Sequence, residues 1–356
     1  MKTLRILADD LTGALDCAAA FGAGVPVHLG APAADQPAAG IDIVATATRD
    51  VPVADLPALL TPSVAWLHGA GIAFKKVDSL LRGNTFAEVD YLARQGGFER
   101  IVFAPAFPAQ GRVTEGGRQW VVKADDSRSP VGPESIAQAL VGDVPVWVPD
   151  VRSDADMDAV VALALKPETA RWLWCGSAGL AHAMARGLDL DVPAATPASE
   201  RGMGAPMLVS ASHHPVSREQ WRVLRASRWA DECHAGAKPE TLRRAAEGYP
   251  RLIDLSPQEM ITADQAAALL ERQAALIAEN APRPGALVIV GGDTLLAMCR
   301  ALGASGLVSE TAMDRAGWGC ARMVGGKWDG VVCHTRSGAF GGAEDLLQVI
   351  EGIAAV

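Results

Sequence analysis

The sequence predicts an α/β fold with two domains, each containing a largely parallel sheet flanked by helices. Short apolar runs alternate with stretches of helical periodicity, which is the pattern of βα units rather than of a sandwich or a bundle. The 356 residues exceed the size of a typical single core. The segment from Leu188 to Pro206 is rich in Pro, Ala, Ser and Gly and has neither periodicity, so it is interpreted as a linker. We therefore predict domains at residues 1–190 and 205–356.

The individual elements follow from the same apolar runs. In the N-terminal half we expect helices between several of the strands, with Gly176 and Ser177 opening the last one. The strands predicted there are Leu4–Ala8, Val25–Leu29, Ile41–Ala45, Ala73–Val77, Ile101–Ala104, Val144–Val148 and Trp172–Cys175. Beyond the linker, helices are predicted from Val216, over Asp264–Asn280, from Thr294 and from Ala343, and strands at Met207–Ser210, Leu252–Leu255, Leu287–Val290 and Val331–Thr335.

Composition excludes several classes of function. The 32 basic and 41 acidic residues give a net charge of -9, which lacks the basic surplus typical of nucleic-acid binding. The six cysteines show no CxxC pair or zinc-site spacing and are interpreted as buried, reduced thiols. Asp9 and Asp10 come too early for a signal peptide, and no apolar run approaches membrane-spanning length. We expect a soluble cytoplasmic protein with neither nucleic acid nor membrane as partner.

Acidic residues follow the first predicted strand in LRILADDLTGA. In open α/β sheets ligands collect at the carboxyl ends of strands, beside the free amides of helix starts. Asp9 and Asp10 could there accept sugar hydroxyls, hold Mg²⁺ or act as a general base. The alternative is helix capping, which we expect of one of the two acids but not of both.

A second polar cluster follows the strand that ends at Val77, in KKVDSLLRGN. The guanidinium of Arg82 suits a carboxylate or phosphate, and Asp78 could accept a proton from a reacting hydroxyl. Under the alternative interpretation, Lys75 and Lys76 form a solvated edge and RGN is a plain turn.

Two further arginines follow predicted strands. Arg112 ends the Pro-rich stretch APAFPAQGR, which is suited either to a rigid ligand wall or to a purely structural loop. Arg49 ends TATRD and is a further candidate for binding a carboxylate.

The second half contains Gly-rich and Ser-rich strand-to-helix turns. The turn at Gly291–Thr294 is typical of phosphate binding, because glycines allow close approach to backbone amides. Gly338 and Gly341 lie in a second such turn, and Ser212 lies in the loop SASHHPVS. The adjacent His213 and His214 are interpreted as loop residues rather than metal ligands. Neither a GxxxxGK[ST] P-loop nor a GxGxxG fingerprint is present.

The segments ADDLTGA, KKVDSLLRGN, PAFPAQGR, GSAGLA, GGDT and SGAFGG occur in this order along nearly the whole chain. Together they resemble the four-carbon acid sugar kinase family, and KKVDSLLRGN is similar to its threonate and erythronate kinase branch. The resemblance implies an N-terminal domain that binds the sugar acid, a C-terminal domain that binds ATP, ligands in the cleft between them, and a 4-phosphorylated product.

The resemblance also implies roles for individual residues. On the acid side these are Asp9, Asp10, Arg49, Asp78, Ser79, Arg82 and Arg112; on the ATP side they are Ser212, Gly291, Gly292, Asp293, Thr294, Gly338 and Gly341. We expect an arginine to clamp the carboxylate and Mg²⁺ with Gly-loop amides to steady the γ-phosphate. Asp78 and Asp10 are the candidate bases, with Asp78 favoured.

The chain departs from the family pattern at two places. SASHHPVS stands where the family is close to SGSxSPVT, and Leu80 stands where Thr is common. The altered loop motivates one alternative, a non-catalytic protein that binds nucleotide and sugar acid. A kinase of a different small hydroxy acid is another, and a dehydrogenase is disfavoured by the missing fingerprint. The sequence leaves open the stereochemistry of the acid and the oligomeric state, for which a homodimer is one arrangement.

Overall fold

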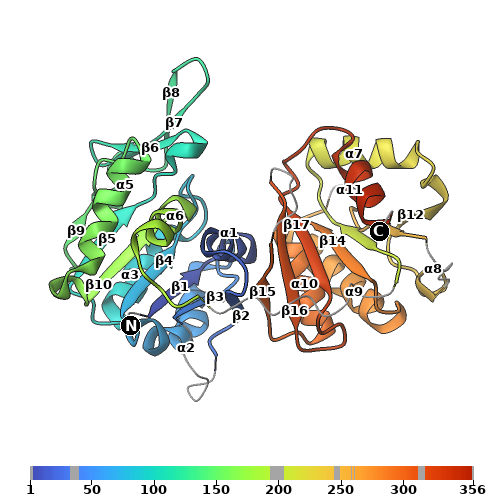
Figure 1. Ribbon diagram of the computed structural model, residues 1–356, viewed down its shortest axis with the longest axis horizontal. Helices are drawn as coiled ribbons and strands as arrows, with labels where there is room; N and C mark the ends of the chain where they lie inside the picture. The colour runs from blue at the N-terminus through green and yellow to red at the C-terminus, as the bar shows by residue number, and fades with distance from the viewer. Residues whose placement is uncertain are drawn as a thin grey trace. The chain divides into compact units, whose positions relative to one another are not determined.

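The computed structural model describes residues 3–32, 40–192, 204–243, 249–257, 259, 261–311 and 317–354. The chain divides into two compact units, Met1–Ala194 and Ala195–Val356, which are treated separately below (Figure 1). Most of the predicted linker Leu188–Pro206 lies outside the described residues.

The N-terminal unit is built on a parallel sheet with strand order β2-β3-β1-β4-β10-β5-β9. Its strands are short apolar runs because a parallel sheet covered on both faces buries nearly every side chain. They are β1 (Leu4–Ala8), β2 (Pro26–Leu29), β3 (Ile41–Ala45), β4 (Ile72–Lys76), β5 (Arg100–Ala104), β9 (Val146–Trp147) and β10 (Trp172–Gly176).

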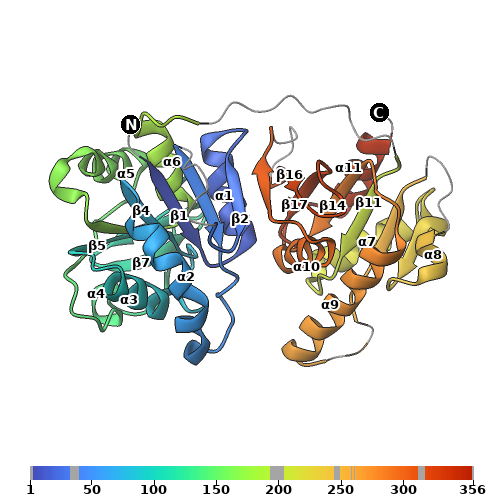
Figure 2. The ribbon, with the colours of Figure 1, turned by 90° about the horizontal axis from the view of Figure 1, so that it is seen from below.

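Helices cover both faces of this sheet (Figure 2). Helices α1 (Leu11–Phe21), α5 (Asp154–Val161) and α6 (Ala178–Gly187) pack together on one face. Helices α2 (Leu56–His68) and α3 (Thr85–Gln95) pack on the other, where Leu60, Leu92 and Phe103 contribute to the core. A short helix α4 (Ile136–Ala139) follows later in the chain.

A small antiparallel sheet projects from this unit (Figure 1). It consists of β6 (Arg112–Glu115), β7 (Arg118–Val122) and β8 (Arg128–Val131), in the order β6-β7-β8. The turn between β6 and β7 is Gly116-Gly117, with φ of 60° and 73°. Positive φ at both central residues is what a tight hairpin turn requires, and glycine adopts it without strain. The sequence analysis did not predict this sheet, although Gly-Gly between two such runs is a hairpin signal.

The C-terminal unit contains a sheet with strand order β12-β13-β11-β14-β17-β16-β15. The first five strands are parallel, whereas β16 pairs antiparallel with both β17 and β15. The strands are β11 (Met207–Ser210), β12 (Cys233–Ala235), β13 (Arg251–Asp254), β14 (Ala286–Val290), β15 (Gly306–Ser309), β16 (Gly319–Val324) and β17 (Val332–Arg336).

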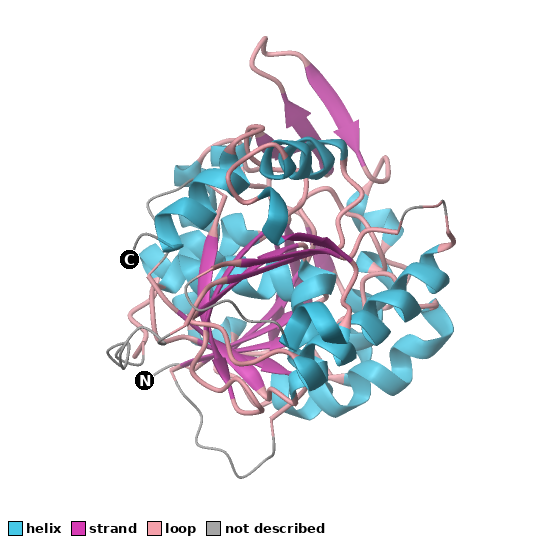
Figure 3. Cartoon of the chain, turned by 90° about the vertical axis from the view of Figure 1, so that its right-hand side faces the viewer, coloured by secondary structure: helices cyan, strands magenta, loops and turns pink. Residues whose placement is uncertain are grey.

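Helices again lie on both faces of this sheet (Figure 3). Helices α8 (Pro239–Arg243), α9 (Ala263–Asn280) and α10 (Gly292–Leu302) pack in sequence on one face. Helices α7 (Pro215–Arg225) and α11 (Asp345–Ala354) pack on the other, over a core that includes Trp221 and Ile350.

The predicted α/β class with largely parallel sheets is confirmed, and most predicted strand bounds agree within one or two residues. The predicted strand Val144–Val148 is only Val146–Trp147, at the sheet edge. The strands β12, β15 and β16 were not predicted. All six cysteines are free, but Cys233 and Cys320 are only partly buried. Within the described ranges, no helix is both long enough and apolar enough to cross a bilayer.

Candidate active site

The acid-side candidates follow three adjacent strands. β1 pairs in parallel with β3 and with β4, and in this register Ala8 lies opposite Ala45 and Lys76. The three strands therefore end at the same edge, and the loops after them carry Asp9 and Asp10, Arg49, and Asp78 with Arg82. In the strand order, β2 and β3 lie on one side of β1 and β4 lies on the other, so the chain changes direction across the sheet at β1. Ligands of open α/β sheets bind at such points.

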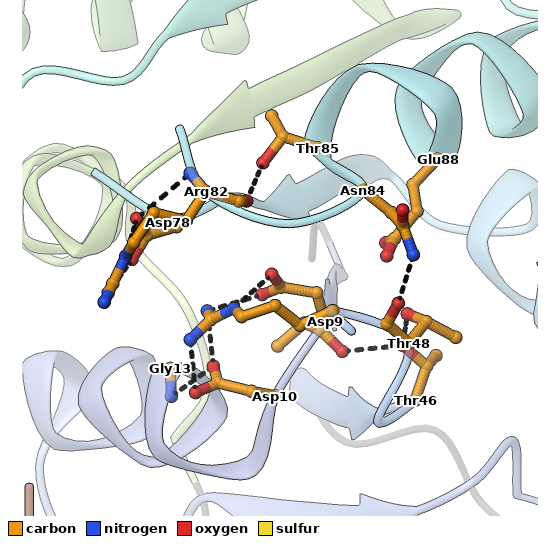
Figure 4. A network of polar contacts seen from close by, with 12 residues as sticks. Asp9, Asp10, Gly13, Thr46, Thr48, Asp78, Arg82, Asn84, Thr85 and Glu88 are labelled. Carbon is orange, nitrogen blue, oxygen red and sulfur yellow. Dashed lines mark hydrogen bonds and ion pairs between the residues drawn. The ribbon is translucent and has the colours of Figure 1, made fainter. Parts of the chain in front are cut away.

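Arg49 joins the first two of these loops by contacting Asp9 and Asp10, which are labelled in Figure 4. Its Nε and Nη2 donate to the two oxygens of Asp9 at 2.8 and 3.0 Å. Its Nη1 and Nη2 donate to the two oxygens of Asp10 at 2.8 and 2.9 Å. A guanidinium has five N–H donors, and four are used here. Arg49 therefore has a single donor left for a ligand, so its predicted part as carboxylate clamp has little support from its own contacts.

The same contacts set the electrostatics of Asp9, which is only 2% exposed. Burial by itself would raise the pKa of Asp9, but the charges of Lys75 and Arg49 and the hydrogen bond from Arg49 outweigh it and lower that pKa. For Arg49, burial works against the charged form, and the hydrogen bond and charge of Asp9 overcome it and raise the pKa. Asp9 and Arg49 are thus both charged, and their hydrogen bonds hold each side chain in place.

Asp10 caps α1. Its Oδ1 accepts from the backbone N–H of Gly13 at 2.8 Å, and its backbone is extended, as an N-cap requires. Asp9 makes no such contact, so one of the two acids caps the helix, as the sequence analysis expected. The side chain of Asp10 keeps 23% of its surface exposed.

Asp78 and Arg82 lie four positions apart in the loop between β4 and α3 and form an ion pair. Nε and Nη2 of Arg82 donate to Asp78 at 2.8 and 2.7 Å, and the backbone amides of Leu80 and Arg82 add longer bonds. Burial opposes ionisation of Asp78, but the hydrogen bonds and charge of Arg82 dominate and lower its pKa to about 2. The Arg82 side chain is 64% exposed and has no second carboxylate among the described residues, so it can reach a ligand.

The two lysines before this loop are buried, so the interpretation of Lys75 and Lys76 as a solvated edge is wrong. Successive residues of a strand point to opposite faces of the sheet. Lys75 points toward α3, where its Nζ lies 2.6 Å from Glu88 and both side chains are almost fully enclosed. Lys76, 5% exposed, points toward the start of α1.

The other two acid-side candidates lie near the small sheet. Arg112 begins β6, and its Nη1 contacts Oε1 of Gln110. Burial lowers the pKa of Arg112, and none of the carboxylates that the structure describes is paired with it. The carbonyl of Ser79 accepts from Nε2 of Gln119 in β7 at 3.1 Å, so β7 braces the Asp78 loop.

Two residues of this region were missed by sequence reasoning. Gln119 is one; it is fully buried in β7 and also donates to Pro105. Asn84 is the other, and its Nδ2 donates to the carbonyls of Thr48 and Val51 at 2.9 and 2.7 Å, which fixes the Arg49 loop (Figure 4). A buried amide at a strand position is the signal that could have identified Gln119.

The nucleotide-side candidates also share one sheet edge. β11, β14 and β17 are adjacent and parallel, with Ser210, Val290 and Arg336 in register at their carboxyl ends. The loops that carry Ser212, Gly291–Thr294 and Gly338–Gly341 leave from these three ends.

At the second of these loops α10 begins two residues earlier than predicted. Gly291 is its N-cap with φ of 105°, a value that favours glycine, and the helix starts at Gly292. Asp293 is exposed in the first turn, whereas Thr294 is 2% exposed and points inward. The free amides of this helix start could bind an anion, so the role of this loop in phosphate binding stays a prediction.

Ser212 and Gly338 lie in contact. A Cβ built on Gly338 would be 2.0 Å from Oγ of Ser212, and the carbonyl of Gly338 accepts from Oγ of Ser217 at 2.8 Å. His214 caps α7 through Nδ1, which accepts from Val216 at 3.3 Å. The predicted Ser212 loop therefore packs directly on the predicted Gly338 loop.

A buried arginine that the sequence analysis did not identify holds this second loop. Arg336, 2% exposed, pairs with Asp345 at 2.6 Å and contacts the carbonyl of Phe340 and Oε1 of Gln220. Its guanidinium also lies 4.9 Å from the centre of the Trp318 ring. Gly341 lies against Arg336 and Asp345. The loop from Ser337 to Gly342 is thereby fixed at both ends.

Comparisons with known proteins give consistent results. Residues 4–135 match a family model described as a sugar-binding N-terminal domain. A D-threonate kinase from Bordetella bronchiseptica is 30% identical over 98% of this chain and 97% of its own length. A D-threonate kinase from Salmonella typhimurium is 25% identical over 97% of both chains.

Two solved structures share the fold. One, described as a putative tRNA synthase from Salmonella typhimurium, has a TM-score of 0.71 at 18% identity and covers 99% of this chain and 100% of its own. The other, a Haemophilus influenzae protein of a family of unknown function, has a TM-score of 0.66 at 18% identity over 98% of this chain and 100% of its own.

Proposed function

Because the chain belongs to the four-carbon acid sugar kinase family, we propose that it uses ATP to phosphorylate the terminal hydroxyl of a four-carbon acid of the D-threonate type. It is a phosphotransferase that acts on a hydroxyl group of a sugar acid. The proposal of a terminal-hydroxyl kinase depends on one observation. Four charged residues come together at one edge of the N-terminal sheet: Asp10, Arg49, Asp78 and Arg82.

Arg82 and Arg112 bind the carboxylate of the acid in this proposal. Arg82 is largely exposed and Arg112 has no carboxylate partner in the described part of the chain, so both have donors for a ligand. A guanidinium fork matches a carboxylate with two parallel hydrogen bonds. Arg49 instead fixes Asp9 and Asp10 relative to each other, and Ser79 lines the loop between Asp78 and Arg82.

Asp10 accepts the proton of the reacting hydroxyl in this proposal. Asp78, which the sequence analysis favoured, is held by Arg82 with a pKa of about 2, and this opposes proton uptake. If Arg82 binds the carboxylate end of the acid, the terminal hydroxyl lies at the far end of the substrate, away from Asp78. Asp10 is more exposed than Asp78 and is supported by α1. The role of Asp78 is then to hold Arg82 in position.

ATP binds the C-terminal unit in this proposal, where the start of α10 and the Gly338 loop offer backbone amides for its phosphates. Mg²⁺ usually takes one or two carboxylates together with phosphate oxygens. Asp293, exposed in the first turn of α10, is the carboxylate on this side that fits such a site. The metal would neutralise charge on the transferred phosphoryl group.

The test is ADP release with D-threonate, D-erythronate and their enantiomers, each with ATP and Mg²⁺. The proposal expects turnover of at least one acid, with the phosphate on the terminal oxygen by ³¹P and ¹³C NMR. Saturable binding of ATP and an acid without any ADP release would favour the non-catalytic alternative. A product phosphorylated at another oxygen would overturn the assignment of the hydroxyl.

A further inference from the structure

Lys76 is a buried cation at the acid site that none of the roles above uses. It is the last residue of β4 and is 5% exposed. Among the described residues, no side chain forms an ion pair or a hydrogen bond with its ammonium, whereas the neighbouring Lys75 is paired with Glu88. Burial opposes its charge, but the acidic groups Cys17, Asp9 and Asp10 raise the pKa of Lys76. The ammonium therefore carries a charge and has donors that the fold leaves unused.

The start of α1 leaves room for this ammonium. A Cβ built on Gly13 would lie 2.8 Å from Nζ of Lys76 and 2.5 Å from Oδ1 of Asp10. Gly13 is helical and has no positive φ, so its backbone does not require glycine, and glycine inside a helix costs about 0.5–1 kcal/mol relative to alanine. The contact accounts for the glycine. It also places the ammonium and the Asp10 carboxylate beside the same Cα atom.

The neighbouring charges indicate which part of the substrate Lys76 contacts. Asp9 and Asp10 already balance the charges of the two cations beside them. A further carboxylate there would have no cation of its own, and Arg82 and Arg112 are available for it elsewhere. A hydroxyl is neutral, and it can accept from an ammonium while it donates to a carboxylate. Lys76 and Asp10 supply this donor and acceptor.

We propose that Lys76 is a further catalytic residue, whose ammonium donates to the terminal hydroxyl oxygen of the sugar acid while Asp10 accepts the hydroxyl proton. This inference rests on the proposed kinase function. As that oxygen bonds to the γ-phosphorus of ATP, the bond from phosphorus to the β,γ-bridging oxygen breaks and ADP leaves with that electron pair. A fixed positive charge at the attacking oxygen stabilises the negative charge that deprotonation leaves there.

The test measures coupling between Lys76 and the terminal hydroxyl by calorimetry, without nucleotide. The ligands are D-threonate and its 4-deoxy analogue, which lacks only that hydroxyl. The proteins are the wild type, Lys76→Met and the control Lys166→Met, which removes an exposed lysine at the opposite edge of the sheet, before β10. We expect the wild type and the control to prefer D-threonate about 10- to 100-fold, as a hydrogen bond to a charged group implies. In Lys76→Met the preference should shrink by at least about threefold, because only the contact with Asp10 then remains.

If Lys76 has a purely structural role, Lys76→Met should lower the affinity for both ligands equally and leave the preference for D-threonate unchanged. That result overturns the inference. If Lys76→Met does not fold, Gly13→Ala replaces it, because it keeps every charged side chain and displaces both the ammonium and the Asp10 carboxylate, the proposed donor and acceptor of that hydroxyl. An unchanged preference there also overturns the inference. If Lys76→Met loses the preference for D-threonate but the wild type transfers no phosphate, the kinase proposal is refuted and the contact between Lys76 and the hydroxyl is upheld. If the wild type binds neither acid, both proposals fail.

Discussion

Replacing Asp10 with asparagine separates the two candidate bases. Asparagine has the same size as aspartate and keeps one carbonyl oxygen, so it can still cap α1 through the Gly13 amide at 2.8 Å. It loses one of the two Arg49 contacts, while both Asp9 contacts of Arg49 remain. The expected loss of stability is about 1.5–3 kcal/mol, the range for one hydrogen bond to a charged group. The variant should therefore fold.

The expected loss of activity is much larger. Removal of a general base costs about 10²- to 10⁴-fold in turnover, which corresponds to about 3–5 kcal/mol of activation free energy. Asp78→Asn should instead leave kcat within about threefold of the wild type, because it changes only the partner of Arg82 and so acts on acid binding.

Steady-state kinetics with ATP and D-threonate, on proteins whose folding is checked by circular dichroism, measure both effects. Asp158→Asn is the matched control, since Asp158 is exposed on α5 and, among the residues that the structure describes, forms an ion pair with Arg186 alone. If Asp78→Asn loses turnover while Asp10→Asn keeps it, the argument from hydrogen bonds and pKa is refuted. The base is then Asp78, as the sequence analysis favoured.

Three further outcomes are expected. Arg49→Met leaves two carboxylates without their shared cation and should lower the free energy of unfolding in urea by about 3–5 kcal/mol. Gly338→Ala places a Cβ 2.0 Å from Oγ of Ser212, so ATP affinity by calorimetry should fall about tenfold with D-threonate affinity unchanged. Arg82→Gln should lower stability at pH 7 by about 1 kcal/mol, discounted because Arg82 is exposed. The folded-state pKa of Asp78 is depressed to about 2, so the stability difference between the wild type and Arg82→Gln should persist above about pH 4 and disappear as the pH falls through 2. A stability difference that stays constant over this pH range would contradict the assignment of the ion pair.

The positions of the site residues could be predicted because parallel strands share an edge. Once Leu4–Ala8 and Ile41–Ala45 are identified as strands, Asp9 and Arg49 must emerge close together. Which charged groups then pair could not be predicted. Arg49 and Asp9 are forty positions apart. On sequence evidence the partner of Asp9 could equally have been any of the four other acid-side cations, which are Lys75, Lys76, Arg82 and Arg112.

The burial of the lysine pair was missed for a related reason. Two adjacent lysines at a strand end suggest solvent exposure, but the twofold period of a strand sends Lys75 and Lys76 to opposite faces. Each is then buried under a different helix, and only the tertiary structure supplies Glu88 for one and the start of α1 for the other. The antiparallel strands β15 and β16 were missed because their sequences, with few apolar residues in a row, lack the signature of fully buried strands.

The projecting antiparallel sheet has a practical consequence for following the enzyme in solution. Gln119, which holds the carbonyl of Ser79, is buried in β7. The turn between β7 and β8, residues 123–127, is exposed throughout. Exposed loop tips tolerate insertions and chemical labels, because few contacts depend on them. A fluorophore attached through Ala124→Cys, at an exposed position of this turn, would sit at the end of the strand whose Gln119 holds the Ser79 carbonyl. A change in its emission on addition of D-threonate would show that the acid site and the tip of the small sheet are coupled.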